Sequence, residues 1–449
     1  MTRPLPLAPT VLLLLAASLV GLAAPDAQGV PRQDSARQRA AAADSAHERT
    51  APPRRPFTPG PPPAICTPSP DTVAPPDSLL RPLPALVPTP RSVRGLYVNR
   101  WAAIGHRMWE LIDVARRTEI NTLVIDVKDD RGLVLYPSRV PLAHEIGADT
   151  VLPMRLERMR AVLDTMRTYG IYPVARIVVA KDPLLAEHHT EWAIRKRADP
   201  SAPWLDDHGK PWLDPHHPQV WRYATALACE AVSLGFSEVQ FDYVRFPDDD
   251  AIRREAVFPL AAGRTRAEVI REQLRSVRAW LRPLGVPVTA DVFGLTTSDT
   301  TDMGIGQRWE MFVDAVDVVL PMMYPSHYAP GSYHLGNPNA HPYEVIDHGL
   351  RDARERSEGI VGAARVVPWY QDFTLGAPRY GAAQVRAQIR AGYDNGITSW
   401  VLWNPGSRYT LSALEPESPA AASGVSADDA RSGAARAESD SGGGAPLLP

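Results

Sequence analysis

Cysteine is nearly absent from this sequence, which has only Cys66 and Cys229 among 449 residues. Two cysteines are too few for a disulfide framework or a thiolate zinc site, so we expect a fold that does not depend on cross-links. An excess of charge is also missing, because 48 Lys and Arg residues stand against 51 Asp and Glu residues. The resulting net charge of -3 gives no field able to hold a polyanion, which argues against a nucleic-acid partner.

Long apolar runs are scarce as well, and the clearest one covers residues 11–24. It is shorter than the roughly 20 residues that a membrane-spanning helix needs, and small residues follow it. We therefore expect residues 1–27 to be a secretory signal peptide, with a mature N-terminus between Ala24 and Gly29. The mature protein would then be secreted, periplasmic or part of the cell envelope, without a stable membrane span. A retained N-terminal anchor is the alternative topology.

Proline is the residue in excess, with 46 copies that gather before the centre of the chain. Residues 28–93 are rich in Pro, Ala, Ser and Arg, which predicts a disordered tether without a core. Residues 415–449 shift to Ala, Ser, Gly and Asp, which predicts a disordered tail. The remaining residues 94–414 have the length of a single α/β barrel.

Residues 94–414 alternate short runs of branched apolar residues with helical patterns, as repeated β-α units do. The runs predict strands over 95–99, 122–127, 172–179, 238–243, 287–293, 318–323, 365–370 and 398–403. Apolar spacings of three and four predict helices over 108–117, 154–169, 219–234, 269–284 and 383–394. Eight such units predict an α/β fold of the (β/α)8 TIM-barrel type. A doubly wound open sheet is the alternative, but residues 97–101 form no phosphate-binding glycine loop.

Two carboxylates are expected to face the inside of this barrel. Side chains alternate between the faces of a strand, so Gln240 and Asp242 share one face and their apolar neighbours share the other. The apolar face suits packing against helices, which turns Asp242 inward. The same alternation turns Thr289 and Asp291 inward on the next strand. Since chemistry in such barrels takes place at the carboxyl ends of the strands, Asp242 and Asp291 are the candidate catalytic residues.

Buried carboxylates need a cation, a hydrogen-bond network or a functional reason. A structural interpretation pairs Asp242 and Asp291 with Arg176, Lys128 or Arg245 as ion pairs that fill the barrel. A functional interpretation uses the two carboxylates to cleave a glycosidic bond, one as the acid and the other as the nucleophile or base.

Other polar and aromatic residues lie at or near the predicted strand ends, where flat rings can stack on sugars. Lys128, on the same face of its strand as Asp126, is either a substrate clamp or part of an ion pair. His327 follows the sixth strand and is a candidate contact for a sugar hydroxyl or an acid-base helper. The residues expected to bind substrate are Asp126, Lys128, Arg176, Trp212, Asp214, Gln240, Tyr243, Arg245, Tyr324, His327, Trp369, Gln371 and Trp403.

Other kinds of site have little support. The pairs at residues 188–189 and 216–217 are adjacent histidines, whose side chains point in different directions and rarely bind one ion together. No Gly-x-Ser-x-Gly elbow follows a strand, so serine-histidine chemistry is not indicated. We expect neither a metal ion nor a cofactor.

Several segments together resemble a known family. Residues 212–221 read Trp-Leu-Asp-Pro-His-His-Pro-Gln-Val-Trp, and residues 241–247 read Phe-Asp-Tyr-Val-Arg-Phe-Pro. With residues 94–98, 121–129 and 321–328, these stretches resemble the bacterial "putative glycoside hydrolase domain" family over nearly all of residues 94–414. The resemblance implies a TIM barrel with Asp242 as nucleophile or base and Asp291 as acid. Amylase-type barrels carry Glu at the second position, so this sequence departs from their pattern there.

The leading hypothesis is a glycoside hydrolase that cleaves a polysaccharide or glycoconjugate with paired carboxylates. A carbohydrate-binding barrel without catalysis is the alternative, and a metal-dependent hydrolase of another bond is a third possibility. Carbohydrate is the expected partner. The sequence predicts neither the sugar and linkage, nor the stereochemical course, nor the oligomeric state.

Overall fold

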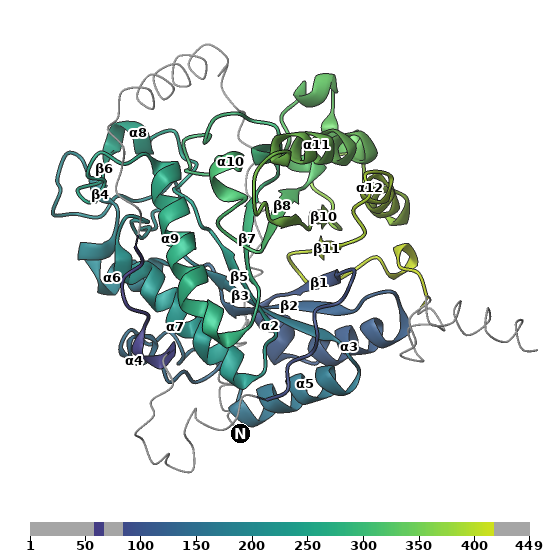
Figure 1. The fold of residues 1–449 in the computed structure, drawn as a ribbon, viewed down its shortest axis with the longest axis horizontal. Helices are drawn as coiled ribbons and strands as arrows, with labels where there is room; N and C mark the ends of the chain where they lie inside the picture. The colour runs from purple at the N-terminus through teal and green to yellow at the C-terminus, as the bar shows by residue number, and fades with distance from the viewer. Residues whose placement is uncertain (1–57, 67–83, 417–449) are drawn as a thin grey trace, which may run out of the picture.

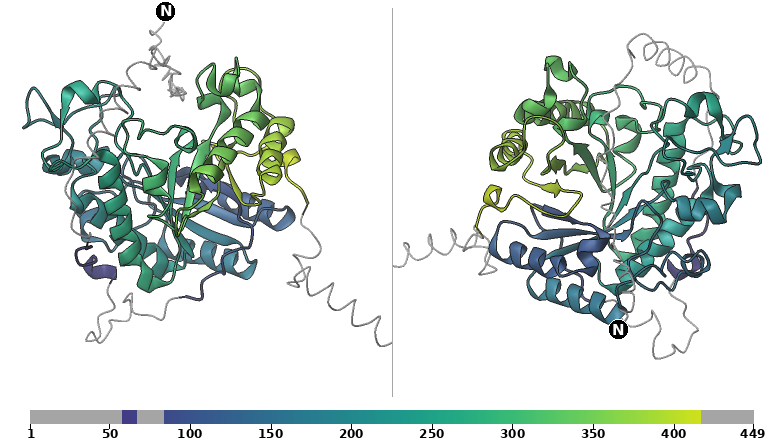
Figure 2. Two further views of the ribbon diagram at one scale, coloured as in Figure 1. Left: turned by 45° about the horizontal axis from the view of Figure 1, so that its top comes forward. Right: turned by 180° about the vertical axis from the view of Figure 1, so that it is seen from behind.

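The computed structural model describes residues 58–66 and 84–416 of the chain. The predicted signal peptide, much of the predicted tether and nearly all of the predicted tail lie outside these ranges. The described residues form a barrel of parallel strands with helices around the outside (Figure 1; Figure 2).

Eight strands close the barrel in sequence order. Strand β10 pairs with both β8 and β11, and β11 pairs with β1, so the sheet has no free edge there. The short β9 (Arg365–Val366) comes just before β10 in the chain and, like β10, pairs with β8. The barrel strands are β1 (Arg94–Val98), β2 (Thr122–Lys128), β3 (Tyr172–Val178), β5 (Glu238–Asp242), β7 (Val288–Phe293), β8 (Val318–Met323), β10 (Trp369–Gln371) and β11 (Trp400–Trp403). The predicted (β/α)8 barrel is confirmed.

Six long helices cover the outside of the barrel, and each follows a strand. They are α3 (Arg107–Arg117), α5 (Leu156–Thr168), α7 (Pro218–Leu234), α9 (Arg266–Leu281), α11 (Pro342–Ser357) and α12 (Ala382–Asp394). After β7 come only the short 3-10 helix η4 (Gly294–Thr297) and the four-residue α10 (Trp309–Phe312). None of the helices in the described ranges is both long and apolar enough to cross a lipid bilayer.

The loops that follow the first strands carry smaller elements. Four short helices lie there: α2 (Arg100–Ile104), α4 (Pro141–Glu145), α6 (Pro183–His188) and α8 (Ile252–Glu255). Strands β4 (Arg195–Lys196) and β6 (Ala256–Val257) pair in a separate antiparallel sheet, which joins the loops after β3 and β5. These loops extend the carboxyl-terminal side of the barrel, where the candidate residues were expected.

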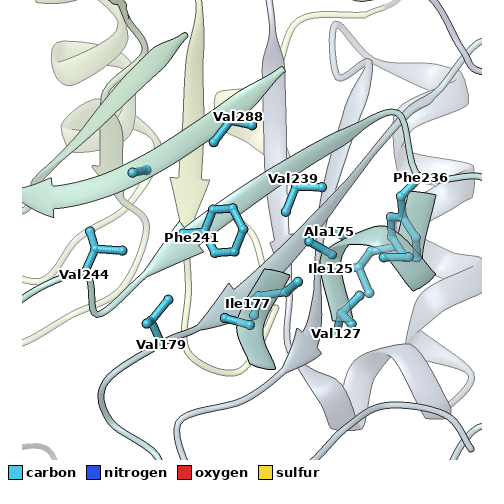
Figure 3. Close-up of a cluster of buried hydrophobic side chains, with 14 of the residues drawn as sticks. Ile125, Val127, Ala175, Ile177, Val179, Phe236, Val239, Phe241, Val244 and Val288 are labelled. Carbon is cyan, nitrogen blue, oxygen red and sulfur yellow. The ribbon is translucent and has the colours of Figure 1, made fainter. Parts of the chain in front are cut away.

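The alternation of side chains explains why this sequence forms a barrel. Val239 and Phe241 on β5 and Val288 on β7 are fully buried in the layer between the strands and the helices (Figure 3). The other face of the strands fills the interior with a second apolar cluster that includes Val124, Val174 and Leu320. Burial on both faces removes a large apolar area from water, which stabilises the barrel.

Part of the predicted tether packs on the barrel, contrary to the expectation of a segment without packed structure. Cys66 forms a disulfide with Cys229 on α7, so the expectation of a fold without cross-links was wrong. Nearby, the carbonyl oxygen of Gly60 accepts a hydrogen bond from Trp280 Nε1 at 2.7 Å. Further along, Val87 is buried and its amide donates to Ser237 Oγ at 2.9 Å. Proline-rich sequence keeps its carbonyl acceptors, so its composition did not prevent docking.

The end of the described chain occupies the place that an eighth helix would take. After β11 the chain forms the short η8 (Leu411–Ala413) and then pairs with the end of α3. There the amide of Glu119 donates to the carbonyl of Glu415 at 2.8 Å, and the amide of Glu415 donates to Glu119 Oε1 at 3.0 Å. Residues 414–416 therefore lie near the amino end of β2, on the side opposite the strand carboxyl ends.

Loss of the disulfide should destabilise the protein. Replacing Cys66 with Ser frees a segment that the cross-link holds across 163 residues of sequence, and native disulfides typically contribute about 2 to 4 kcal/mol. We expect urea unfolding of Cys66→Ser to show a loss in this range, and Cys229→Ser and the double variant to show the same loss. A double variant that lost clearly more than either single variant would contradict this account.

Stability should also depend on Glu238, which is buried at the amino end of β5. Burial raises the pKa of its carboxyl to about 7, although a hydrogen bond from the Tyr172 hydroxyl at 3.0 Å opposes the shift. The folded state then holds a proton that the unfolded state releases, so the stability that Glu238 contributes is fully present below its ordinary pKa of 4.5 and is lost as the pH rises from there to about 7. The loss amounts to at most about 3 kcal/mol. Glu238→Gln should flatten that part of the profile in urea titrations at several pH values, and an unchanged slope would contradict the assignment.

Candidate active site

The candidate site forms around a single guanidinium near the carboxyl ends of the strands. Arg176 on β3 contacts carboxylates from three other strands. Its Nη1 lies 2.5 Å from Asp126 Oδ1 on β2, and its Nη2 forms an ion pair with Asp242 Oδ2 on β5. Its Nε lies 3.8 Å from Asp291 Oδ2 on β7. All four side chains are buried.

Two aromatic rings lie against this guanidinium. Tyr97 on β1 and Trp403 on β11 stack with 3.9 Å between ring centroids, and the guanidinium carbon of Arg176 lies 5.4 Å and 5.5 Å from the two centroids. The Tyr97 hydroxyl donates a hydrogen bond to Asp126 Oδ2. The rings add cation-π attraction in a place that excludes water, where such contacts are strongest.

Asp291 has its own set of donors. Gln240 Nε2 donates to its two oxygens at 2.8 Å and 3.0 Å, and Trp369 Nε1 donates to Oδ1 at 2.7 Å. Burial and the charge of Asp242 raise the pKa of the Asp291 carboxyl well above its ordinary value. The donors and Arg176 act in the opposite direction by stabilising the ionised form.

The backbone immediately after β5 holds the side chain of Asp242 in place. The amide of Tyr243 donates to Asp242 Oδ1 at 2.5 Å. Tyr243 has a φ of 52°, in the left-handed region that bulky residues seldom adopt. Such strain costs of order 1–3 kcal/mol and persists where a surrounding structure enforces it, often at functional sites.

The charges in the cluster alter one another's protonation. Burial raises the pKa of Asp126 to about 6, against the lowering effects of Arg176 and of the hydrogen bond from Tyr97. For Arg176, burial alone would lower the pKa, but the charges of Asp126 and Asp242 raise it well above the ordinary value of a guanidinium. The arginine therefore stays charged, while at least one carboxyl of the cluster can carry a proton near neutral pH.

Much of this arrangement agrees with the expectations from strand alternation. Asp242, Asp291 and Gln240 all contribute to the interior cluster, and Arg176 pairs with both aspartates, as the structural interpretation required. Arg245 does not take that role, because it binds Asp248 Oδ1 at 2.9 Å. The cluster is therefore an ion network and a possible catalytic site at the same time.

Lys128 is the residue that the sequence placed on the wrong face. The register of β2 against β3 shifts between Asp126 and Lys128, so Lys128 pairs with Ile177 on the outer face. Its ammonium group is buried, lies 2.7 Å from Asp182 Oδ2 and donates to the carbonyl of Val178 at 2.7 Å. Lys128 thus joins a buried ion pair behind the barrel wall and does not share a face with Asp126.

An aromatic group borders the cluster on the side of β8, β10 and β11. The Tyr324 ring stacks at 6.3 Å from Trp403 and meets His327 edge-on at 5.4 Å. The buried Tyr324 hydroxyl makes no hydrogen bond to the described residues. Burial lowers the pKa of the His327 imidazole, and Gln371 accepts a hydrogen bond from the Ser326 amide at 3.0 Å. This group is the part of the predicted substrate surface that adjoins the carboxylates.

The remaining predicted substrate residues form a second group on the loops after β3 and β5. Arg245 lies over the rings of Trp212 and Tyr243 at 5.1 Å and 4.9 Å. Asp214 has a local role instead, because it accepts hydrogen bonds from the His216 amide at 3.0 Å and from His216 Nδ1 at 2.6 Å. In the described part of the chain, no three His, Cys, Asp or Glu side chains gather in a way that could hold a metal ion.

Tyr97 is the member of the cluster that the sequence analysis missed. It lies on β1 between Leu96 and Val98, both fully buried on the outer face. The same alternation that turned Asp242 inward would have turned Tyr97 inward, next to Asp126 on the adjacent strand.

The chain is similar to known proteins in sequence and in fold. A family model described as "Putative glycosyl hydrolase domain" matches residues 95–409. Among solved structures, a hypothetical protein from Ruminiclostridium thermocellum ATCC 27405 is 37% identical, covering 44% of this chain and 97% of its own, with a TM-score of 0.40. The PgaB (BpsB) glycoside hydrolase domain from Bordetella bronchiseptica is 15% identical, covering 73% of this chain and 100% of its own, with a TM-score of 0.51, a likeness of fold. A search of the curated proteins gives no match.

The corrected place of Lys128 leads to a stability prediction. Lys128→Met should lower the free energy of unfolding by about 3–5 kcal/mol, because it leaves Asp182 buried without its cation. Adding Asp182→Asn should recover part of that loss, since the asparagine oxygen can still cap α6. Lys181→Met is the matched control, because its partner Asp130 is only partly buried and the pair should contribute at most about 1 kcal/mol. Equal losses in urea unfolding for the two lysine variants would contradict this assignment.

Proposed function

This chain belongs to the family described as "Putative glycosyl hydrolase domain", and on that premise we propose that it hydrolyses a glycosidic bond in a polysaccharide or glycoconjugate. The observation that supports the proposal most is the convergence of Asp126, Asp242 and Asp291 around Arg176 near the carboxyl ends of the barrel strands. Active sites of this fold lie on that side, and glycosidic cleavage needs two carboxyl groups in different protonation states.

Asp242 is our candidate for the nucleophile or base. It is the last residue of β5, and Arg176 and the Tyr243 amide both donate hydrogen bonds to its carboxylate. The acid must be a carboxyl that keeps a proton near neutral pH, for which the cluster offers Asp291 and Asp126. The family resemblance assigns that role to Asp291, on the fifth strand of the barrel.

The aromatic residues supply the proposed surface for sugars. Rings at Tyr324, Trp403 and His327 lie beside the carboxylates, and Trp212 and Tyr243 form a second group with Arg245. Flat apolar faces next to hydrogen-bonding groups suit sugar rings, which carry C–H bonds on one face and hydroxyls around the edge.

Export from the cytoplasm fits the same proposal. The Cys66–Cys229 disulfide is of the kind that persists in oxidising compartments and is rare in the cytosol. It supports a secreted or envelope location, in line with the signal peptide expected over residues 1–27, which lie outside the described ranges.

A carbohydrate-binding barrel without catalysis is the second candidate, and one observation favours it. Each of the three carboxylates is already bound by donors from the protein. A fully bonded network of this kind can serve the fold alone, and catalysis requires a substrate that replaces part of it.

The deciding experiment measures new reducing ends with the purified protein and a panel of polysaccharides, with glycan binding measured in parallel. Asp242→Asn should lower the turnover number by at least about 100-fold while binding survives, because the charge acts mainly in the transition state. Asp248→Asn is the matched control, since this neighbouring carboxylate pairs with Arg245 and is exposed. Tight glycan binding without any cleavage by the wild type would favour the non-catalytic barrel.

A further inference from the structure

The three carboxylates of the cluster differ in what can happen to a proton placed on them. Asp242 is bound by Arg176 Nη2 and the Tyr243 amide, which are donors only. Asp291 is bound by Gln240 Nε2 and Trp369 Nε1, which also donate as arranged. A proton added to either carboxyl would meet the N–H groups that now bind it, and none of these groups, as arranged, can accept it.

Asp126 has a different neighbour. Its Oδ1 is held by Arg176 Nη1 at 2.5 Å, but its Oδ2 is held by the hydroxyl of Tyr97. A phenol oxygen can accept a hydrogen bond as well as donate one, and the change needs only a rotation of the O–H bond. The hydrogen bond between Asp126 and Tyr97 can therefore reverse, so that both the charged and the neutral carboxyl are satisfied.

We propose that Asp126, and not Asp291, is the carboxyl that gives and regains the proton during the reaction, with Tyr97 as the residue that makes this exchange possible. This inference rests on the proposed glycosidic hydrolysis. Asp126 would protonate the oxygen of the leaving sugar while the bond from that oxygen to the anomeric carbon breaks. Water then supplies the new hydroxyl on the anomeric carbon, and the proton that it releases restores the neutral acid.

The charged and titratable groups around Asp126 suit this role. Burial and the charge of Asp129 raise the pKa of Asp126, whereas Arg176 and Tyr97 lower it, and the result of about 6 is close to ambient pH. An acid with such a pKa is protonated often enough to donate and is strong enough to transfer its proton. The groups that face it are Tyr97, Asp129, Arg176 and Tyr409, with Asp242 and Asp291 on the other side of the arginine.

Asp291 then has another role in the cluster. Held by Gln240 and Trp369, it remains in place as a fixed acceptor beside Arg176 Nε, and it helps to keep the guanidinium oriented toward Asp126 and Asp242. Asp291 is therefore a positioning residue in this proposal, which accounts for its deeper and more complete enclosure.

A titration tests the proposal without relying on activity. In protein with 13C-labelled aspartate carboxyls, the resonance that is absent from Asp126→Asn should titrate with a midpoint near 6. Tyr97→Phe should move that midpoint upward, because the hydroxyl favours the charged form, and Tyr370→Phe, which removes another buried phenol, should not move it. The proposal is overturned if the resonance absent from Asp291→Asn titrates there instead, or if Tyr97→Phe leaves the Asp126 midpoint unchanged.

A kinetic experiment provides a second test of the roles of Asp126 and Asp291. Asp126→Asn retains an oxygen for Arg176 and an amide that can donate to the Tyr97 oxygen, so it mimics the neutral acid and should fold. We expect it to lower kcat/KM by at least about 100-fold on the natural linkage and far less on aryl glycosides with activated leaving groups. Asp291→Asn should lower kcat/KM to the same extent for both kinds of substrate. The opposite pattern would assign the acid role to Asp291. If the wild-type protein hydrolysed no substrate, the proposed function would be wrong, but the titration would still show whether Asp126 holds the proton.

Discussion

One guanidinium has to compensate three buried carboxylates. A single positive charge at Arg176 balances one negative charge, so the remaining charge must be spread by hydrogen bonds or removed by protonation. Burial raises the pKa values of both Asp126 and Asp291, and Tyr97, Gln240 and Trp369 surround these two carboxyls with hydrogen-bond donors. Because these groups come from six strands of a closed barrel, none can move far without breaking a contact made by another.

That constraint links the fold to the chemistry. A closed parallel sheet fixes where each strand ends, and its staggered register brings residues of β2, β3, β5 and β7 to one point in the interior. The apolar layer beneath them keeps out water, which strengthens every electrostatic contact in the cluster. The same exclusion of water would help a catalytic proton stay on its carboxyl until a substrate arrives.

Strand alternation was sufficient to predict the inward aspartates, because apolar residues on both sides of Asp242 and Asp291 leave only one face for each carboxylate. It failed for Lys128, since one irregular step in β2 moves every later side chain to the other face. The residue between Asp126 and Lys128 is the apolar Val127, and nothing in the sequence at this point indicates the irregularity. The disulfide was missed for another reason: the packing of residues 58–66 on α7, which no local pattern encodes, brings Cys66 to Cys229.

The described ends of the chain lie away from the strand carboxyl ends. Residues 58–66 run along α7 and α9, and residues 414–416 lie beside the end of α3, near the amino end of β2. An affinity tag, a second protein or a solid support joined at either position would leave the approach to the carboxylates open. The barrel is therefore suited to immobilisation or display with the carboxyl ends of its strands turned away from the support.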